Sequence, residues 1–318
     1  MKKVLITGAS GFIGSNLAQH LHENNYYLIG MRRNKGEISA SQSKIDQWIE
    51  CDLCKEDNQI DSVMKDVDYV IHLAGNAHEK RDIPYSHCRE VNTQATARLV
   101  EKAAENSVKK FIFISTIKVN GENTDENPFT EISEPHPQDH YSRSKYEAEK
   151  QIVAICKNHT MNYVIIRPPL VYGIGVRANF LSLMRLLTYR LPLPFASITN
   201  RRSFIYAGNL ADLIEKCLIS DKVNNNLYLA QDVSMSLPQL LDNLAEALEV
   251  KNNTFRCPVD LLLNMGKLIG KGDVMMKLLA SLEVDDSKIR VDLGWEPPVS
   301  YIDSIRETAS WYKNELEG

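Results

Sequence analysis

The 318-residue sequence predicts an α/β fold, in which a doubly wound parallel sheet is followed by a smaller, mostly helical C-terminal domain. Three observations lead to this fold class. Short apolar runs such as "KKVLITG" (residues 2–8) lack a polar face, as expected of strands buried on both sides. Segments with the apolar spacing of helices lie between these runs. A glycine-rich turn joins the first run to the first helical segment.

Strands and helices alternate through the first half of the chain, as in parallel sheets with helical crossovers. We expect strands at residues 2–8, 26–33, 47–53, 67–75, 109–116 and 161–169. Helices are expected at residues 12–24, 91–107 and 140–158. The polar residues 34–45 are typical of a loop, and residues 121–139, with three prolines and many acids, of a loop over a surface or mouth. After about residue 170 the alternation loosens, and helices are expected at 177–189, 208–220, 236–249, 259–270 and 300–316.

Composition restricts the possible partners. The chain is 43% hydrophobic and 25% charged, with a net charge of −4 and no long basic block, which argues against nucleic acid or an anionic membrane as the main partner. No apolar run approaches ~18 residues, so no transmembrane helix is expected. Six scattered cysteines indicate reduced thiols and a cytoplasmic location. Cys51 and Cys54 form a C-x-x-C, but no second ligand pair exists, so we expect no metal site.

The turn after the first strand reads "TGASGFIG", with glycines at Gly8, Gly11 and Gly14. Glycine lets the backbone turn tightly and lets a pyrophosphate approach closely, while the start of the following helix offers free N–H groups and a positive dipole end. A strand, this turn and a helix together predict the dinucleotide site of a Rossmann-type sheet. We therefore assign residues 1–170 to a dinucleotide-binding domain and residues 171–318 to a substrate-binding region, from which the chain is free to cross back.

The motifs resemble, over nearly the whole chain, the extended short-chain dehydrogenase/reductase family and its NAD-dependent epimerase/dehydratase group, which acts on nucleotide sugars. The spacing of "TGASGFIG" is that of this family, and "CDLCKED", "HLAG", "VNTQAT", "RPPLVYG" and "RRSFIYAGNLADLI" look like its other elements. Ala95 stands where the family often has glycine. Besides the three glycines, the resemblance implies a set of cofactor-binding residues: Phe12, Ile13, Asp52, Leu53, Leu73, Ala74, Gly75, Asn92 and Pro168.

Tyr141 and Lys145, in "YSRSK", are four residues apart on a predicted helix and therefore share one face. A phenol has a pKa near ~10 in isolation, and a neighbouring cation favours the phenolate and lowers that pKa. We therefore expect Tyr141 to be a general acid/base at an alcohol or ketone oxygen. The resemblance implies that Lys145 also hydrogen-bonds the nicotinamide ribose, so both residues are assigned to catalysis and to cofactor binding.

Two hydroxyl residues end the preceding strand. When "VNG" is matched to the family's "VYG", Thr116 takes the position of the catalytic hydroxyl that hydrogen-bonds the reacting oxygen, with Ser115 as the alternative. Nucleotide-sugar 4,6-dehydratases of the family carry Asp-Glu directly after this threonine, to eliminate water across C5 and C6. Ile117 and Lys118 stand there instead. Because isoleucine cannot transfer a proton, we expect hydride and proton exchange at a single carbon.

The second strand bears on the choice of cofactor. An acidic residue at its end usually holds the 2′-hydroxyl of NAD, whereas an arginine accommodates the 2′-phosphate of NADP. Here no acid appears until Glu37, and Arg32 and Arg33 stand where a phosphate would lie. Guanidinium groups bind phosphate in a bidentate manner. The sequence therefore favours NADP(H), with NAD(H) as the alternative.

For the substrate, the resemblance implies that Asn179 and Arg202 hold the diphosphate of a nucleotide sugar, with Arg201 as an alternative, and that Ser115 and Thr116 contact the sugar. The chain resembles bacterial surface-polysaccharide members of the family, including UDP-hexose 4-epimerases and UDP-4-keto-6-deoxy-N-acetylhexosamine 4-reductases. We expect an NADPH-dependent reductase acting at C4 of a UDP-sugar. The alternative is a 4-epimerase with bound NAD. A non-enzymatic cofactor-sensing protein is disfavoured by the intact Tyr–Lys pair. The family's habit suggests a homodimer.

Overall fold

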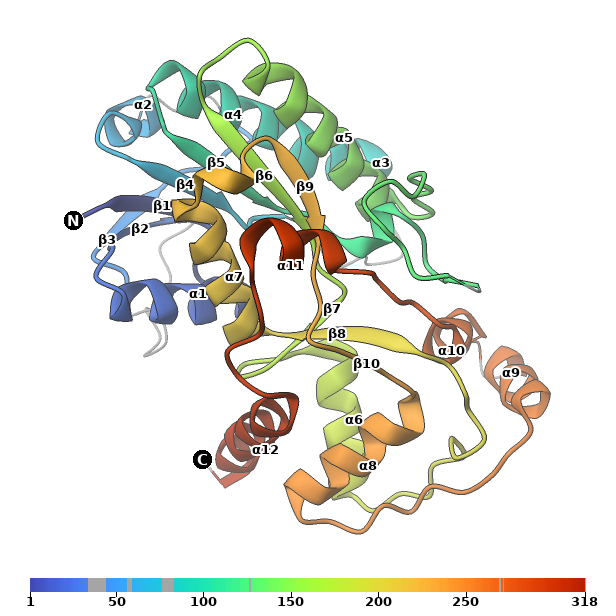
Figure 1. The fold of residues 1–318 in the computed structure, drawn as a ribbon. Helices are drawn as coiled ribbons and strands as arrows, with labels where there is room; N and C mark the ends of the chain where they lie inside the picture. The colour runs from blue at the N-terminus through green and yellow to red at the C-terminus, as the bar shows by residue number, and fades with distance from the viewer. Residues whose placement is uncertain are drawn as a thin grey trace.

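The computed structural model describes residues 1–33, 44–55, 59–75, 83–125, 127–268, 270 and 272–317. A seven-stranded sheet forms the larger layer of the molecule, with strand order β3-β2-β1-β4-β5-β6-β9. Every neighbouring pair in it is parallel. Its strands are β1 (Lys3–Thr7), β2 (Tyr27–Arg32), β3 (Gln47–Glu50), β4 (Tyr69–His72), β5 (Lys110–Ile114), β6 (Asn162–Arg167) and β9 (Asn226–Leu229). The predicted doubly wound parallel sheet is confirmed (Figure 1).

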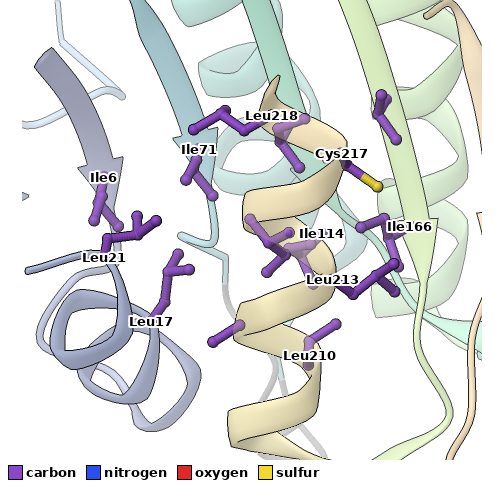
Figure 2. Close-up of a cluster of buried hydrophobic side chains, with 14 of the residues drawn as sticks. Ile6, Leu17, Leu21, Ile71, Ile114, Ile166, Leu210, Leu213, Cys217 and Leu218 are labelled. Carbon is purple, nitrogen blue, oxygen red and sulfur yellow. The ribbon is translucent and has the colours of Figure 1, made fainter. Parts of the chain in front are cut away.

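Helices cover both faces of this sheet, which is why the middle residues of its central strands are apolar. One face carries α1 (Phe12–Glu23) and α7 (Ala207–Ile219). Figure 2 shows side chains of these helices meeting Ile6, Ile71, Ile114 and Ile166 of the sheet. The other face carries α2 (Gln59–Met64), α4 (Ala95–Glu105) and α5 (His140–Cys156).

The helix predicted at residues 91–107 begins earlier and is not uniform. It comprises α3 (Tyr85–Cys88), a π-helical turn η2 (Arg89–Gln94) and α4. Such wide turns inside helices occur frequently at functional sites. The loop predicted at 34–45 lies mostly outside the described residues, which resume at Lys44.

A smaller layer follows, built on the three-stranded sheet β10-β8-β7. Its strands are β7 (Leu170–Tyr172), β8 (Arg202–Tyr206) and β10 (Val233–Met235). Helices α6 (Ala178–Thr188), α8 (Leu237–Leu248) and α12 (Tyr301–Glu317) pack around it in a second core, below the large sheet in Figure 1. The remaining helices are α9 (Val259–Leu268), α10 (Gly272–Leu279) and α11 (Ser287–Leu293), and the short 3-10 turns are η3 (Ile117–Val119) and η4 (Asp221–Val223).

The C-terminal half therefore contains strands that the sequence did not predict. The helix expected at 259–270 ends at Leu268, and α10 follows it. Moreover, α7 and β9 return to the large sheet, where β9 pairs with β6. None of the helices in the described residues has the length and apolar composition needed to cross a membrane.

Candidate active site

The glycine turn after β1 is so tight that side chains cannot fit in it. Gly8 has a φ of +70°, and a Cβ there would lie 2.9 Å from the Ala74 nitrogen. A Cβ on Gly14 would lie 2.2 Å from the Gly8 oxygen. The Gly11 N–H donates to that same oxygen at 2.9 Å, and Gly11 then starts α1 without a side-chain cap. The first amides of α1 are thus left to a ligand, as a pyrophosphate requires.

A cavity of about 520 Å³ opens beside this turn, at the ends of β1, β2, β3 and β4. The predicted cofactor residues among its lining are Gly8, Gly11, Arg32, Arg33, Asp52, Leu53, Leu73, Ala74 and Gly75. Other lining residues, which the sequence analysis did not assign, are Thr7, Ser10, Met31, Cys51, Cys54, His72, Val91 and Ala95. The glycine cradle and the elongated set of strand ends fit a dinucleotide.

The predicted cofactor residues Phe12, Ile13 and Pro168 are not in the lining of this cavity. Ile13 packs against the core under the large sheet, whereas Phe12 packs against the second core. The first turn of α1 thereby touches both parts of the molecule. Asp52 accepts a hydrogen bond from the Cys54 nitrogen at 3.1 Å and so shapes its own turn. The carbonyl of Pro168 accepts from the Ile117 nitrogen at 3.0 Å, so this proline supports the segment after Thr116.

Asn92 connects the cavity to the Tyr–Lys helix. Its amide donates to the Ser144 hydroxyl at 2.9 Å, and that hydroxyl donates to the Tyr141 carbonyl at 2.7 Å. A Cβ built on Gly75 would lie 3.2 Å from Asn92 Oδ1 and 3.6 Å from Lys145 Nζ. Gly75, Asn92 and Lys145 therefore meet at one edge of the cavity.

Tyr141 and Lys145 lie in the first two turns of α5, which begins at a capping box between Asp139 and Ser142. Lys145 is only 2% exposed, and its ammonium lies 4.0 Å from the centre of the Phe113 ring. Burial lowers the pKa of Lys145 to about 7, although the Glu149 carboxylate raises it. Burial raises the pKa of Tyr141, and the charge of Asp139 raises it further. The sequence predicted that Lys145 would lower the pKa of Tyr141, but in the protein alone burial and Asp139 raise that pKa instead.

The two hydroxyls after β5 have different surroundings. Ser115 is 4% exposed and donates to Glu149, which forms a buried ion pair with Arg167. Thr116 is half-buried and caps η3 by accepting from the Lys118 nitrogen at 3.3 Å. Because Ser115 is bound into the buried cluster, Thr116 is the hydroxyl better placed to serve a ligand.

The next two residues have structural partners. Ile117 is 3% exposed in a small apolar cluster with Leu229, Leu282 and Val284. The ammonium of Lys118 lies 2.7 Å from a carboxylate oxygen of Asp139. Neither side chain is an acid that could serve an elimination.

The two candidate arginines of β2 also differ. Arg32 donates to Glu50 on the neighbouring strand at 3.3 Å, and its guanidinium lies 5.4 Å from the centre of the Trp48 ring. The parallel register of β2 and β3 sets Arg32 beside Glu50. Arg33 follows β2 and lines the cavity. Both arginines were expected to meet a phosphate, whereas Arg32 has a carboxylate partner.

The predicted diphosphate residues lie on the second part of the molecule. Arg202 begins β8 and donates to the carbonyls of Lys277 at 2.6 Å and Ala280 at 3.0 Å. Burial lowers its pKa, although Glu122 raises it. Asn179 lies exposed in the first turn of α6. The alternative, Arg201, is paired with Glu283 at 2.9 Å. Across the described residues, no hydrogen bond or ion pair joins Asn179 to either arginine.

His72, a buried histidine in the lining of this cavity, had no role assigned from the sequence. Thr96 donates to the Asn92 carbonyl at 2.7 Å, so its oxygen accepts from His72 Nε2 at 2.8 Å. His72 Nδ1 therefore accepts from the Thr7 hydroxyl, which lies 2.6 Å away and itself accepts from the Ala74 nitrogen. Burial, and then the charge of Lys145, lower the pKa of His72 to about 3, so the ring is neutral. The motif "HLAG", which begins with His72, was the sequence signal that could have identified this residue.

A glycine-lined dinucleotide cavity next to a Tyr-x-x-x-Lys helix defines the class: a nicotinamide-dependent enzyme of the short-chain dehydrogenase/reductase type. A model of the family described as "NAD dependent epimerase/dehydratase family" matches residues 4–228. The chain belongs to this NAD-dependent epimerase/dehydratase family, in its nucleotide-sugar group.

Individual relatives carry two activities. The chain is 39% identical to a UDP-glucose 4-epimerase of Vibrio cholerae, over 97% of this chain and 94% of that protein. It is 27% identical to the human dTDP-D-glucose 4,6-dehydratase, over 99% and 91% of the two chains. Among solved structures, the UDP-glucose 4-epimerase of Thermotoga maritima with UDP-glucose has a TM-score of 0.80 at 22% identity, covering 99% of each chain. The dTDP-glucose 4,6-dehydratase of Bacillus anthracis with NAD has a TM-score of 0.78 at 18% identity, covering 100% of this chain and 98% of that one. These structures share the fold.

Proposed function

We propose that the protein is a 4-epimerase of UDP-linked hexoses or N-acetylhexosamines that works with bound NAD. The observation that carries the proposal is that Tyr141 and Lys145 form the single acid/base pair of the site. The two residues after Thr116 supply no second acid. Ile117 is buried and Lys118 is paired, so neither can assist loss of water. Proton transfer is then confined to one carbon, which fits an epimerase better than a dehydratase. The similarity to the Vibrio cholerae epimerase supports this choice.

In this proposal Tyr141 takes the proton of the C4 hydroxyl and later returns it, as a general acid/base. Thr116 hydrogen-bonds the same oxygen, and Lys145 holds the cofactor ribose beside the phenol. When bound, an oxidised nicotinamide would accept the C4 hydride and return it. Its positive charge would also favour the phenolate of Tyr141, opposing the effect of burial.

NAD is favoured over NADP by the surroundings of Arg32. The Glu50 carboxylate at 3.3 Å occupies the arginine and would repel a 2′-phosphate. The sequence-based preference for NADP(H) assumed that both arginines were available. Arg33, which lines the cavity, remains the candidate contact for the 2′-phosphate of NADP(H).

The UDP moiety is assigned to the second part of the molecule. We place the diphosphate near Arg202, which is held by two backbone carbonyls, and the exposed Asn179. Residues 1–170 would then hold the dinucleotide and residues 171–318 the nucleotide sugar. The Thermotoga maritima neighbour, with UDP-glucose bound, has a similar fold over its whole length.

The decisive experiment combines mass spectrometry of nucleotides released from the purified protein with an assay lacking added cofactor. We expect released NAD, and interconversion of UDP-glucose and UDP-galactose or of their N-acetyl forms. A reductase is the second candidate, because no acid ends β2 and Arg33 lines the cavity. Stoichiometric consumption of NADPH with a UDP-4-keto-6-deoxyhexosamine, without any interconversion, would establish that candidate and reject the epimerase.

A further inference from the structure

Lys118 joins the segment that carries Thr116 to the helix that carries Tyr141. Its backbone nitrogen donates to the Thr116 hydroxyl at 3.3 Å. Its ammonium donates to Asp139 Oδ2 at 2.7 Å. The other oxygen of Asp139 accepts from the Ser142 nitrogen at 2.6 Å, as the N-cap of α5. One carboxylate is thereby shared between the helix start and Lys118.

Lys118 also faces the substrate side of the molecule. Its ammonium lies 3.8 Å from the Glu122 carboxylate, which pairs with Lys277 of α10 at 2.8 Å. The carbonyl of Lys277 in turn accepts from Arg202 at 2.6 Å. A line of alternating charges thus runs from Asp139 at the start of α5 to Lys277, whose backbone carbonyl contacts the proposed diphosphate residue Arg202. The Lys118 ammonium is the cation of this line that contacts the N-cap of α5.

The charge that Lys118 offsets lies close to the reacting phenol in the chain. Asp139 precedes Tyr141 by two residues, and its carboxylate raises the pKa of Tyr141. Burial would raise the pKa of Asp139, but hydrogen bonds from Lys118 and Ser142 bring it below its usual value. Asp139 is therefore ionised at neutral pH, and an unpaired carboxylate there would disfavour the phenolate.

Few other charges compete with this pair. Arg143 and Arg89 both lie near Glu147, at 3.6 Å each. Among the described residues, the other titratable groups around this end of α5 include His140, Lys145, Tyr146 and Glu149 of the helix, Tyr85 of α3 with its ring 5.6 Å from that of His140, His136 with its nitrogen bound to the Val119 carbonyl, the neutral His72 of β4, and Glu122 beyond Lys118.

We propose that Lys118 is a positioning residue for the reaction: its ammonium fixes Asp139 at the start of α5 and neutralises the carboxylate two residues before Tyr141. This role rests on the proposed function, in which Tyr141 is the acid/base. It also means that the enzyme requires a positively charged side chain at position 118. A carboxylate at position 118 would oppose Asp139 with the same charge and loosen the helix start.

The test is the pH profile of turnover of the holoenzyme with UDP-galactose in four variants. Lys118→Met leaves Asp139 uncompensated, so the acidic limb should move to higher pH by about one unit, with about tenfold less turnover on that limb. Lys118→Arg keeps the charge and should restore the limb. Asp139→Asn keeps an N-cap acceptor without the charge and should move the limb to lower pH. In the double variant Lys118→Met/Asp139→Asn, the limb should lie close to that of the wild type.

An exposed, paired lysine far from the site supplies the control. Lys102 on α4 pairs with Asp61 at 3.1 Å, and Lys102→Met should leave the limb unchanged. The inference is overturned if Lys118→Met keeps the wild-type limb, or if the double variant shifts as far as Lys118→Met alone. Asp139→Asn tests it independently should Lys118→Met fold poorly. Tyr141→Phe separates the two hypotheses. An active Tyr141→Phe enzyme would refute the proposed function. If Tyr141→Phe is inactive and Lys118→Met keeps the wild-type limb, only this inference is refuted.

Discussion

Tyr141 and Lys145 both lie where burial disfavours their charged forms. The phenol is harder to ionise than in water, and the ammonium has a pKa of about 7. In the isolated protein, the phenol is therefore protonated at neutral pH and the lysine is only partly charged. A positive charge placed beside the phenol would favour ionisation. In the proposed mechanism, cofactor binding rather than the protein alone would therefore prepare Tyr141 as the base.

Replacement of Tyr141 by phenylalanine should reduce turnover by about 10²–10⁴-fold, because the proton then has no positioned acceptor. Retention of bound NAD should be nearly unchanged, since the ring itself does not hold the dinucleotide. Steady-state kinetics and mass spectrometry of released nucleotide measure the two quantities. Tyr146→Phe, five residues further along the same helix, is the matched control and should keep activity. Near-normal turnover of Tyr141→Phe would show that another group transfers the proton.

Replacement of Lys145 by methionine should abolish turnover yet stabilise the fold. The folded-state pKa of about 7 lies below the unfolded value of about 10.4. Between these values the unfolded state binds more protons, so the unfolding free energy of the wild type rises with pH from about 7 to 10. Lys145→Met removes this slope and the burial of a cation, so near pH 7 it should add about 1 kcal/mol or more. Denaturation of protein stripped of nucleotide measures it, because bound ligand adds its own stabilisation.

A second buried lysine provides the contrast. Lys110 is 4% exposed, but its ammonium donates to the carbonyls of Cys217 and Ser220 at the end of α7. Lys110→Met leaves those carbonyls without their donor and should cost about 1.5–3 kcal/mol. If both methionine variants shift stability in the same direction, the distinction between a functional and a structural lysine is wrong.

Arg33→Ala and Arg32→Ala should show which arginine binds the 2′-phosphate of NADP(H) and which one serves only to bind the neighbouring strand β3. Arg33→Ala should weaken NADP(H) by about tenfold or more, because a charge-assisted contact contributes about 1.5–3 kcal/mol, and should leave NAD(H) nearly unchanged. Arg32→Ala should affect both cofactors alike, since its guanidinium binds Glu50 and stacks on Trp48. Titration of each variant with the two reduced cofactors measures this. Selective loss of NADP(H) in Arg32→Ala would return the 2′-phosphate role to that residue.

At the scale of elements, α5 is held at both ends of its catalytic stretch. Asp139 and Ser142 cap its start, while Glu149 anchors it to β6 through Arg167. Arg167 also donates to Asn120, and Ser115 donates to Glu149. The buried cluster therefore ties the helix to the segment that presents Thr116.

Breaking this cluster from one side should be costly. Glu149→Gln leaves the buried guanidinium of Arg167 without a counter-charge and should lower the unfolding free energy by about 3–5 kcal/mol. The double variant Glu149→Leu/Arg167→Met should recover much of that loss. Asp303→Asn, in an exposed pair with Arg306, is the control and should change stability by about 0.5 kcal/mol or less. Equal effects of the buried and exposed substitutions in denaturant unfolding would contradict this assignment.

Elements could be predicted from sequence where the pattern was long and local. The apolar runs of the central strands and the glycine turn are of this kind, and so is Tyr-x-x-x-Lys. The strands β7 and β10 span only three residues each, too few to show a period. The pairing of Arg32 with Glu50 depends on strand register, and that of His72 with Thr7 joins residues 65 positions apart. Such contacts join residues that are far apart in the chain, so no local sequence pattern predicts them, and they were missed or misjudged.

On the scale of the whole molecule, the two parts of the chain are interleaved. Residues beyond 170 supply α7 and β9 to the large sheet, and the Trp295 ring donates to Asp212 of α7 at 2.8 Å. In return, Phe12 of α1 packs into the second core, and Asn16 donates to the Ile174 carbonyl at 2.9 Å. The division at residue 170 remains a prediction about ligands, whereas the cores do not divide there.

This interleaving predicts that residues 1–170 will not fold alone. The α7 side chains Leu210, Leu213, Ile214, Cys217 and Leu218 are at most 1% exposed and belong to the core on one face of the large sheet. Figure 2 shows Leu210, Leu213, Cys217 and Leu218 facing the sheet. Burying a large apolar side chain contributes about 1.5–3 kcal/mol, so this helix supplies on the order of 10 kcal/mol. That is comparable with the whole net stability of a typical domain, about 5–15 kcal/mol.

A fragment of residues 1–170 should therefore bind a hydrophobic dye strongly and unfold without a cooperative transition. The full chain should show one transition and little dye binding. When residues 171–318 are co-expressed as a separate chain, the two fragments should co-purify, because α7 can then cover the large sheet and β9 can pair with β6. Calorimetry, dye fluorescence and affinity purification measure these outcomes. A compact 1–170 fragment with cooperative unfolding would show that the sheet is stable without its returning helix, and the chain would then have to be treated as two independent domains.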